Sequence, residues 1–397
     1  MSEFVILGGT AVKLVGYYST QSYLYTKNKG GVFSSDSDAE YGNGFASFNI
    51  TGNCDTVWAG NGFQKNVSAS AAPGSENTIT VANTGNVSGG QGLLVWSTNY
   101  KVTNNGTISG ATKNKLYYSA AYPGINNTAN IGVLFLGNAD DAGGSNQLIN
   151  AGTISSPGIA IEADAGDTVI TNTGTISGGT YSILTYGGAD HVDLNSGDVT
   201  GSIDLGTGAA VDQLDLGVTG NLKLHFALDR DTRTSAQVFN AENVTFTNNR
   251  VTLAVTQAED SKNIHNNDSF LIVDANTALT ADITKIAVEA DSTLPMITFS
   301  LSKIANKLYI DSVRDTVYYQ DNSGNASLGQ ALDTLASSST NDMAFILGAL
   351  DDTGNATNAQ KLEPVAAAPV VNAAIETLNN FGNVFSLQMA RLNNDGP

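Results

Sequence analysis

Apolar and polar residues alternate over many short stretches of this chain, which predicts short β-strands. Residues 158–177 contain three such stretches, around Ile161, Ile170 and Ile176. A period of two places every second side chain on the same face of a strand, so one face is apolar and the other polar. Strands this short are not stable alone and need neighbours on both sides. The pattern therefore predicts an all-β protein built by stacking strands.

A motif, Asn-x-Gly-x-(Ile/Val)-(Ser/Thr), recurs along the first half of the chain. Its copies begin at Asn83, Asn104, Asn150, Asn172 and Asn195. The starts are separated by 21, 46, 22 and 23 residues, and we interpret 46 as two periods of 23. Self-similarity at such a period is typical of solenoids, in which each coil pairs with the coils on either side. We predict a right-handed parallel β-helix with about 22 residues per coil.

Each motif position has a mechanical explanation. We expect the glycine to supply the positive φ of a tight corner, where a side chain would clash. Asparagine tolerates corners and bonds its own backbone, and stacked asparagines can form a ladder along the axis. The Ile or Val should enter the core at the same place in every coil. The motif is therefore predicted to be structural.

Changes in composition and in the pattern of apolar residues divide the chain into four parts. Residues 1–75 are irregular and aromatic, which fits an N-terminal cap with early coils or, alternatively, an aromatic platform for sugar. Residues 76–220 carry the repeats, and residues 221–318 contain longer strands. Residues 319–397 include apolar positions at helical spacing, which predicts helices around 331–335, 343–350, 371–378 and 381–392.

Charge and composition exclude several functions. Charged residues make up only 14% of the chain, and the net charge is −19. Nucleic acid and anionic membrane surfaces are therefore excluded as expected partners. Cys54 is the one cysteine, so no intramolecular disulfide forms. Residues 1–8 lack the basic and apolar regions of a secretory signal, so the protein is either intracellular or a chain from which such a signal was removed.

The order of these parts resembles the secreted passenger of bacterial autotransporters, the one-chain outer-membrane secretion (type V) system. The Asn-x-Gly-x-Ile-Ser coils resemble the passenger repeats, and residues 190–206 resemble a rung found before the junction region. Residues 221–318, with Asn267–Ala275, look like the C-terminal folding-promoting (autochaperone) segment. Residues 326–392 resemble the helical linker toward a translocator barrel, and no barrel strands are recognised here.

This resemblance implies export through the periplasm and outer membrane to the bacterial cell surface or the medium. It implies adhesion or self-association, with a glycan, a host or neighbouring cell surface, or other copies of the chain as partner. It also implies an outer-membrane barrel in the parent chain. A rigid face of Asn, Thr and Ser side chains, repeated about every 4.8 Å, would suit such binding.

A polysaccharide-active enzyme is the main alternative, because acids on a β-helix can serve as general acid and base. The candidate carboxylates are Asp140, Asp141, Glu162, Asp164, Asp167, Asp190 and Asp193. Asp167 and Asp190 stand 23 residues apart and could be neighbours on adjacent coils, so Asp167, Asp190 and Asp193 are the weak catalytic candidates. Solvated turn carboxylates are the competing interpretation, and a third possibility is a purely structural stalk.

Two degenerate turns echo a calcium-binding solenoid repeat, with Asp190, Asp193 and Asp212 as candidate ligands. Calcium needs six to eight oxygens, which two turns rarely supply. The three histidines, His191, His225 and His265, are scattered and lack zinc-site spacing. No phosphate-loop or dinucleotide fingerprint occurs in a fitting context. The sequence therefore predicts no cofactor and a protein that acts by binding.

Overall fold

The computed structural model describes the backbone of residues 2–5, 22–28, 32–37, 46–50 and 53–61. It describes backbone and almost all side chains of residues 77–89, 91–95, 100–110, 130–135, 145–164, 166–206, 210–228, 234–257, 264, 266–290, 297–315, 320–321 and 326–336. Two compact units divide the chain, one of residues 1–291 and 299–313 and the other of 292–298 and 314–397.

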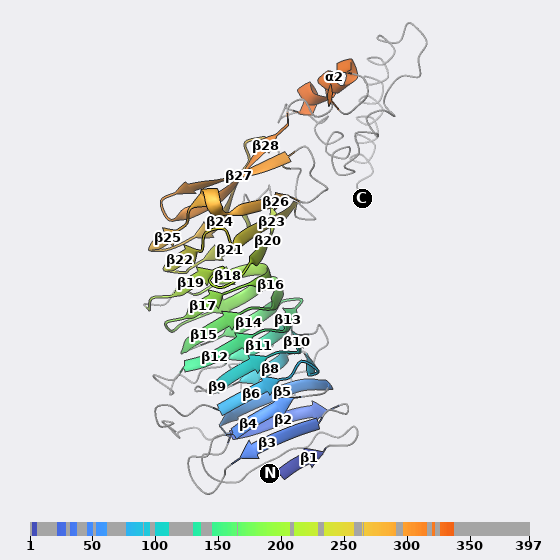
Figure 1. Cartoon of the computed structure of the whole chain (residues 1–397), viewed down its shortest axis with the longest axis vertical. Helices are drawn as coiled ribbons and strands as arrows, with labels where there is room; N and C mark the ends of the chain where they lie inside the picture. Colours follow the sequence, from blue (N-terminus) through green and yellow to red (C-terminus); the bar gives the residue numbers. More distant parts are fainter. Residues whose placement is uncertain are drawn as a thin grey trace, which may run out of the picture. The chain divides into compact units, whose positions relative to one another are not determined.

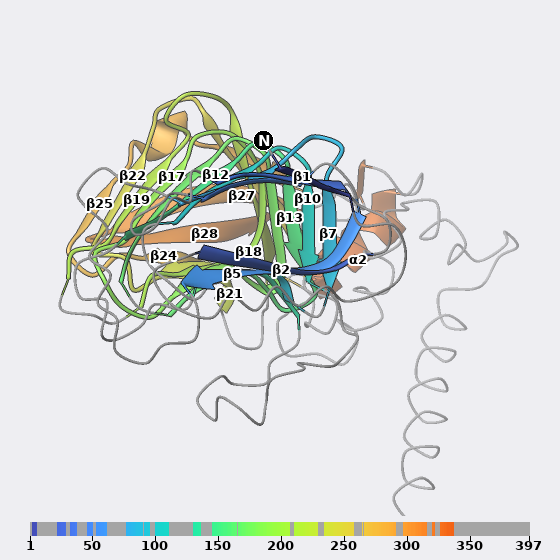
Figure 2. The same ribbon diagram turned by 90° about the horizontal axis from the view of Figure 1, so that it is seen from below.

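In the first unit, short parallel strands stack into three walls (Figures 1 and 2). The first wall contains the later strands of the 11-stranded sheet: β6 (Asn77–Val81), β9 (Tyr100–Asn104), β12 (Ser145–Asn150), β15 (Asp167–Asn172), β17 (His191–Leu194), β19 (Gln213–Leu216), β22 (Asn243–Phe246) and β25 (Ala278–Thr280). The predicted all-β class with parallel stacking is confirmed.

The other two walls belong to one 17-stranded sheet, because β16 (Thr175–Thr185) and β18 (Gly197–Asp204) continue around the corner between them. The second wall also has β7 (Asn86–Gly89), β10 (Thr107–Gly110), β13 (Thr153–Ser156), β20 (Leu222–Leu228), β23 (Val251–Gln257) and β26 (Ala287–Ala290). The third has β8 (Gln91–Val95), β11 (Ile131–Phe135), β14 (Ile159–Ala163), β21 (Thr234–Phe239), β24 (Ser269–Asp274) and β28 (Lys307–Arg314).

Strands at both ends of the stack depart from parallel pairing. Near the N-terminus are β1 (Ser2–Val5), β2 (Ser22–Asn28), β3 (Val32–Ser37), β4 (Ala46–Ile50) and β5 (Asn53–Asn61). β1 pairs with β3, β3 with β4 and β2 with β5, all antiparallel, before β4 pairs parallel with β6. At the other end β28 pairs antiparallel with β24, after the short helix η1 (Ile283–Lys285) and β27 (Ile297–Ile304).

The motif Ile and Val side chains form one column of the core, as predicted. The residues of this column pair in register from coil to coil, and each is at most 2% exposed: Val87, Ile108, Ile154, Ile176 and Val199. Burying each such side chain contributes about 1.5–3 kcal/mol to folding, measured against leaving it in water. This column fixes which residues of the second wall point outward.

The predicted asparagine ladder is present, but it runs through fewer coils than the motif does. Asn104 Nδ2 donates to Asn150 Oδ1 at 2.8 Å, and Asn150 Nδ2 donates to Asn172 Oδ1 at 2.7 Å. All three side chains are fully buried. The ladder ends where Val81 pairs with Asn104 and Leu194 pairs with Asn172, so Asn83 and Asn195 do not join it. Three of the five motif copies therefore share the ladder.

The motif glycines are needed mainly for close contact between coils. A Cβ on Gly106, Gly152 or Gly174 would overlap a carbonyl oxygen at the corner of the preceding coil. We predicted that these positions need glycine because their φ is positive. Among the motif glycines from Gly106 to Gly197, only Gly197 has a positive φ, of +91°. For the other three the prediction is wrong, because the corner backbone turns without entering the left-handed region.

The interval of 46 residues is a single coil. Thr107 pairs directly with Thr153 in the adjacent strand, so no further coil lies between them and the interpretation as two periods is wrong. On the second wall, from β13 to β18, the offset between paired residues is 22 or 23, as for Ile154 with Ile176 and Ile176 with Val199. Long connections inside one coil account for the exception.

The predicted boundary at residue 220 does not interrupt the stack. Gly197 pairs with Leu222, and Leu222 pairs with Val251, so residues beyond 220 continue the same wall with larger offsets. In the second unit the helix α2 (Ala326–Ala336) confirms the helix expected around 331–335. The helices expected at 343–350, 371–378 and 381–392 lie outside the described residues, as do the side chains of 1–75.

Candidate binding face

Thr and Ser side chains form a regular grid on the outside of the second wall. Each of three adjacent strands, β10, β13 and β16, turns its Ile inward and the flanking Thr and Ser outward. The register aligns them in two columns: Thr107, Thr153 and Thr175, and Ser109, Ser155 and Ser177. Neighbouring strands lie about 4.8 Å apart, and residues two apart along a strand are about 6.7 Å apart. We call these six residues the hydroxyl grid.

The hydroxyls of this grid are available to a partner outside the protein. All six side chains are half-buried, which restricts their motion without covering them. Ser109 Oγ makes a long hydrogen bond of 3.4 Å to the Val87 carbonyl. Within the described part of the chain, the other five hydroxyls form no hydrogen bond. A grid of fixed, unused donors and acceptors is a surface for polar ligands.

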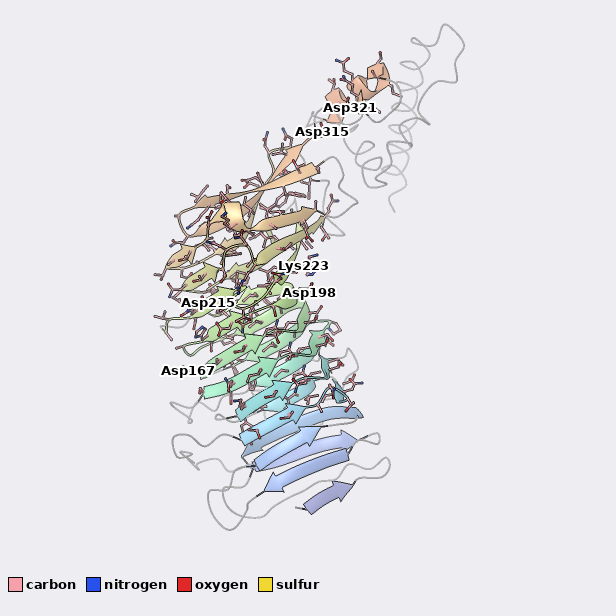
Figure 3. The ribbon with its side chains drawn as sticks, viewed as in Figure 1. Asp167, Asp198, Asp215, Lys223, Asp315 and Asp321 are labelled. Atoms are coloured by element: carbon pink, nitrogen blue, oxygen red, sulfur yellow. The ribbon has the colours of Figure 1, made fainter. Side chains whose placement is uncertain are left out.

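Among the described residues, charged side chains adjoin the hydroxyl grid on the side of β18. Asp198 on β18 pairs with Thr175, and Lys223 on β20 pairs with Asp198, so these charged residues continue the Thr column beyond the grid (Figure 3). His225 Nε2 lies 3.2 Å from Asp198 Oδ1, and Lys223 Nζ lies 2.6 Å from Glu289 Oε2. Lys223 and Glu289 form an ion pair of opposite charges, and the six side chains of the grid themselves carry no charge. An uncharged ligand would meet no electrostatic penalty there.

Two of the aspartates singled out from the sequence, Asp190 and Asp212, point into the solenoid. Each caps a backbone N–H of the coil before it: Asp190 Oδ1 accepts from Thr168 N and Asp212 Oδ1 accepts from Asp190 N, both at 2.8 Å. Glu242 Oε2 continues the series by accepting from Asp212 N. Burial raises the pKa of Asp190 to about 6 and, together with the neighbouring carboxylates, that of Asp212 to about 7. Their role in this arrangement is structural.

Asp167 and Asp193 lie outside the coil, so the predicted pairs do not form. Thr168, one position after Asp167, is level with Asp190, and Asp167 Oδ1 accepts from Ala189 N at 2.8 Å. Asp167 and Asp190 are therefore not two carboxylates on one face. The calcium set is divided as well, with Asp193 outside and Asp190 and Asp212 inside. Asp140 and Asp141 lie outside the described residues.

Asp193 instead belongs to a cluster that sequence reasoning missed. His191 Nε2 lies 3.1 Å from Asp193 Oδ1 and 3.3 Å from Asp215 Oδ2 on the outside of the first wall. In the described part of the chain, this is the one group of three His, Cys, Asp or Glu side chains close enough to share a metal ion. The spacing His-x-Asp, with a further Asp 22 residues on, was the available signal.

A second group of acids, with aromatic neighbours, lies on the third wall. Burial, and then the nearby Asp164, raises the pKa of Glu162 to about 7. Glu162 Oε2 is buried and has no hydrogen-bond partner among the described residues. Tyr186 is 52% exposed, and its pKa is raised by burial and by Glu162 and Asp164. A protonated carboxyl beside an exposed ring is compatible with acid catalysis on a sugar.

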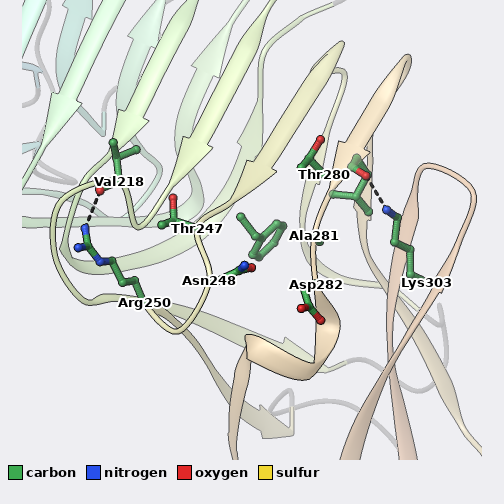
Figure 4. Close-up of a pocket in the computed structure, with 10 residues that line it drawn as sticks. Val218, Thr247, Asn248, Arg250, Thr280, Ala281, Asp282 and Lys303 are labelled. Carbon is green, nitrogen blue, oxygen red and sulfur yellow. Dashed lines mark hydrogen bonds between the residues drawn. The ribbon is translucent and has the colours of Figure 1, made fainter.

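An open pocket of about 850 Å³ lies where the chain leaves the first wall (Figure 4). Arg250 and Lys303 bring two positive charges to its edge, with Asp282 beside them. Arg250 donates to the Val218 carbonyl and Lys303 to the Leu279 carbonyl, each at 2.6 Å. Backbone carbonyls at the coil corners therefore already bind both cations. We interpret the pocket as a structural feature of these corners.

No described helix is both long and apolar enough to cross a membrane. No model of a known protein family matches this sequence. A comparison with curated proteins likewise finds no match.

Proposed function

We propose that this chain acts by binding, through the hydroxyl grid, as the passenger of an autotransporter displayed on or released from a bacterial cell. The observation that carries the proposal is the alignment of Thr107, Thr153 and Thr175 beside Ser109, Ser155 and Ser177, with five hydroxyls unused within the described chain. The proposal includes a right-handed winding and about 22 residues per regular coil. The autotransporter assignment itself rests on the sequence resemblance.

Repetition is what makes such a face a binding surface. A single neutral hydrogen bond contributes only about 0.5–1.5 kcal/mol net. Six hydroxyls at fixed spacing can engage several units of a repetitive ligand together, so weak contacts add without separate entropy losses. Neutral glycans offer hydroxyls at comparable repeats and carry no charge that the −19 chain would repel. A neutral glycan on a host or neighbouring cell is therefore the proposed ligand, and self-association is the alternative partner.

The later parts of the chain have supporting roles in this proposal. Residues 221–318 would promote folding, since β20 and β23 extend the second wall and cover the last regular coil. Residues 319–397 would lead toward a translocator barrel in the parent protein. A chain ending at residue 220 should refold in lower yield than the full chain, and an equal yield would contradict this role.

A panel of immobilised glycans tests the proposed function directly. The full chain should bind at least one neutral, repetitive glycan, or else sediment as reversible oligomers. Changing Thr153 and Thr175 to Val removes two hydroxyls while keeping shape and strand propensity, and should weaken either interaction. Absence of both interactions, or binding unaffected by the double change, would reject the proposal.

Polysaccharide cleavage is a second candidate, favoured by Glu162 alone. Its raised pKa, about 7, would keep it protonated near neutrality as a general acid. The ring of Tyr186 is exposed beside it and could stack on a sugar. New reducing ends released from a glycan panel by the full chain, and abolished by Glu162→Gln, would establish this activity. Their absence would leave binding as the function.

A further inference from the structure

The outward side chains of two neighbouring strands meet on the first wall. The register places His191 beside Gln213, and Asp193 beside Asp215. Parallel strands lie about 4.8 Å apart, and side chains two apart on a strand share a face, so three ligand-type groups converge from β17 and β19. Their side chains are 44%, 30% and 17% exposed for His191, Asp193 and Asp215, which leaves one side of the cluster open to water.

The separations between these groups match those of atoms bound to one small metal ion. Bonds of about 2.0–2.1 Å in tetrahedral geometry place ligand atoms about 3.3 Å apart, and octahedral geometry places them about 2.9 Å apart. His191 Nε2 lies 3.1 Å from Asp193 Oδ1 and 3.3 Å from Asp215 Oδ2, and all three ligand atoms lie within 4.8 Å of one another. The two separations from His191 already have the required length, and the two carboxylates lie close enough to turn toward one ion.

We propose that His191, Asp193 and Asp215 form a site for a divalent transition metal, with zinc as the best-fitting ion. One imidazole and two carboxylates are a zinc-type set, and water from the open side would complete the coordination. Calcium fits less well, because it takes six to eight oxygen ligands and this cluster contributes an imidazole nitrogen. The site is independent of the proposed binding function and lies on a different wall from the hydroxyl grid.

A neighbouring side chain orients one of the ligands. Gln213 Nε2 donates to Asp215 Oδ2 at 2.5 Å, which holds that carboxylate toward His191 (Asp215 is labelled in Figure 3). Outer partners of this kind raise metal affinity by fixing the ligand's direction.

Zinc titration of the full chain by calorimetry tests the site, with a matched control elsewhere on the surface. His225 is also half-exposed and lies 3.2 Å from one carboxylate, that of Asp198, so it matches His191 except that a second acid is lacking beside it. We expect one zinc per chain in the wild type and in His225→Gln. Asp215→Asn and His191→Gln should each weaken binding at least tenfold while the circular dichroism spectrum stays unchanged.

X-ray absorption of the zinc-loaded wild type gives a readout that no variant can confound. Imidazole scattering from one ligand, with oxygen in the remaining positions, is the expected signature. The proposal is overturned by a wild type that binds no stoichiometric zinc, by a first shell without imidazole, or by affinity that Asp215→Asn leaves unchanged. Equal weakening in His225→Gln would also overturn it, because that result indicates diffuse attraction to an acidic surface.

Discussion

Thr107 and Thr153 are 46 residues apart in the sequence, yet they are direct partners in adjacent parallel strands. The connection between β10 and β11 covers residues 111–130, whereas the equivalent connection in the next coil, between β13 and β14, covers only 157–158. The connection between β11 and β12 covers residues 136–144, whereas the equivalent connection between β14 and β15 covers only 164–166. One coil therefore carries two long connections, while its three wall strands keep their places.

The first prediction concerns the longer of these connections. Deleting residues 112–129 leaves Ala111 at the place that Pro157 occupies in the next coil. The coil should still close, and the thermal midpoint should change by no more than about 5 °C, because loop length has a weak effect on stability. Thermal unfolding followed by circular dichroism measures this. A deletion of the same length over 159–176, which removes wall strands, should abolish cooperative unfolding.

Loss of the central ladder asparagine should be costly. Asn150→Ala removes the acceptor of Asn104 Nδ2 and the donor to Asn172 Oδ1, both in the interior. Asn104 Nδ2 keeps its bond to Thr153 O, and Asn172 Oδ1 keeps its bond from Gly174 N. The loss of the two ladder bonds should therefore lower the free energy of unfolding by about 1–3 kcal/mol. Urea denaturation gives the value, and Asn105→Ala at the exposed corner next to the ladder should change it by less than about 0.5 kcal/mol. Similar values for both variants would show that the ladder contributes nothing.

The inward carboxylates should make the solenoid more stable at mildly acidic pH. Burial raises the pKa of Asp190 from 3.8 to about 6, so its stabilising protonation is complete below about pH 4 and is lost as the pH rises through 6. Asp190→Asn keeps an oxygen for Thr168 N, just as Asn146 Oδ1 accepts from Tyr100 N at 3.1 Å. This variant should be more stable than the wild type at pH 8, by on the order of 2 kcal/mol, and less dependent on pH.

Denaturation at pH 5 and pH 8 distinguishes the outcomes for Asp190. An Asn variant that is less stable than the wild type at pH 8 would mean that the ionised carboxylate stabilises the coil. The remaining pH dependence of the variant should come from Asp212, whose pKa is raised in the same direction by burial and by its neighbouring carboxylates.

The sequence predicts the repeated parts of this molecule well. Alternation and the motif place Ile154 and Ile176 in the core, and asparagine chemistry predicts the contact between Asn150 and Asn172. Each of these depends only on local pattern repeated at a constant interval. The long coil defeats this reasoning, because its extra residues together nearly equal one period and look like an additional coil.

The candidate sites were harder to predict because they depend on which way each side chain points. Asp190 and Asp193 are three residues apart, and one points inward while the other points outward, so neither the acid pair nor the calcium set assembles. Contact between His191 and Asp215 depends on the register of two strands. The glycine corners depend on the distance between coils, a quantity that no single motif encodes.

The most direct test of the binding face compares two matched triple variants. Thr107, Thr153 and Thr175 of the hydroxyl grid are changed together to Val, and so are Thr103, Thr171 and Thr245 on the outside of the first wall, which are equally half-buried. Affinity is measured by biolayer interferometry for the best glycan of the panel, or by sedimentation if only self-association occurs. The grid variant should lose about 10- to 1,000-fold, as expected for three hydrogen bonds, while the first-wall variant keeps wild-type affinity. Equal affinities for the two variants would contradict the hydroxyl grid as the binding surface.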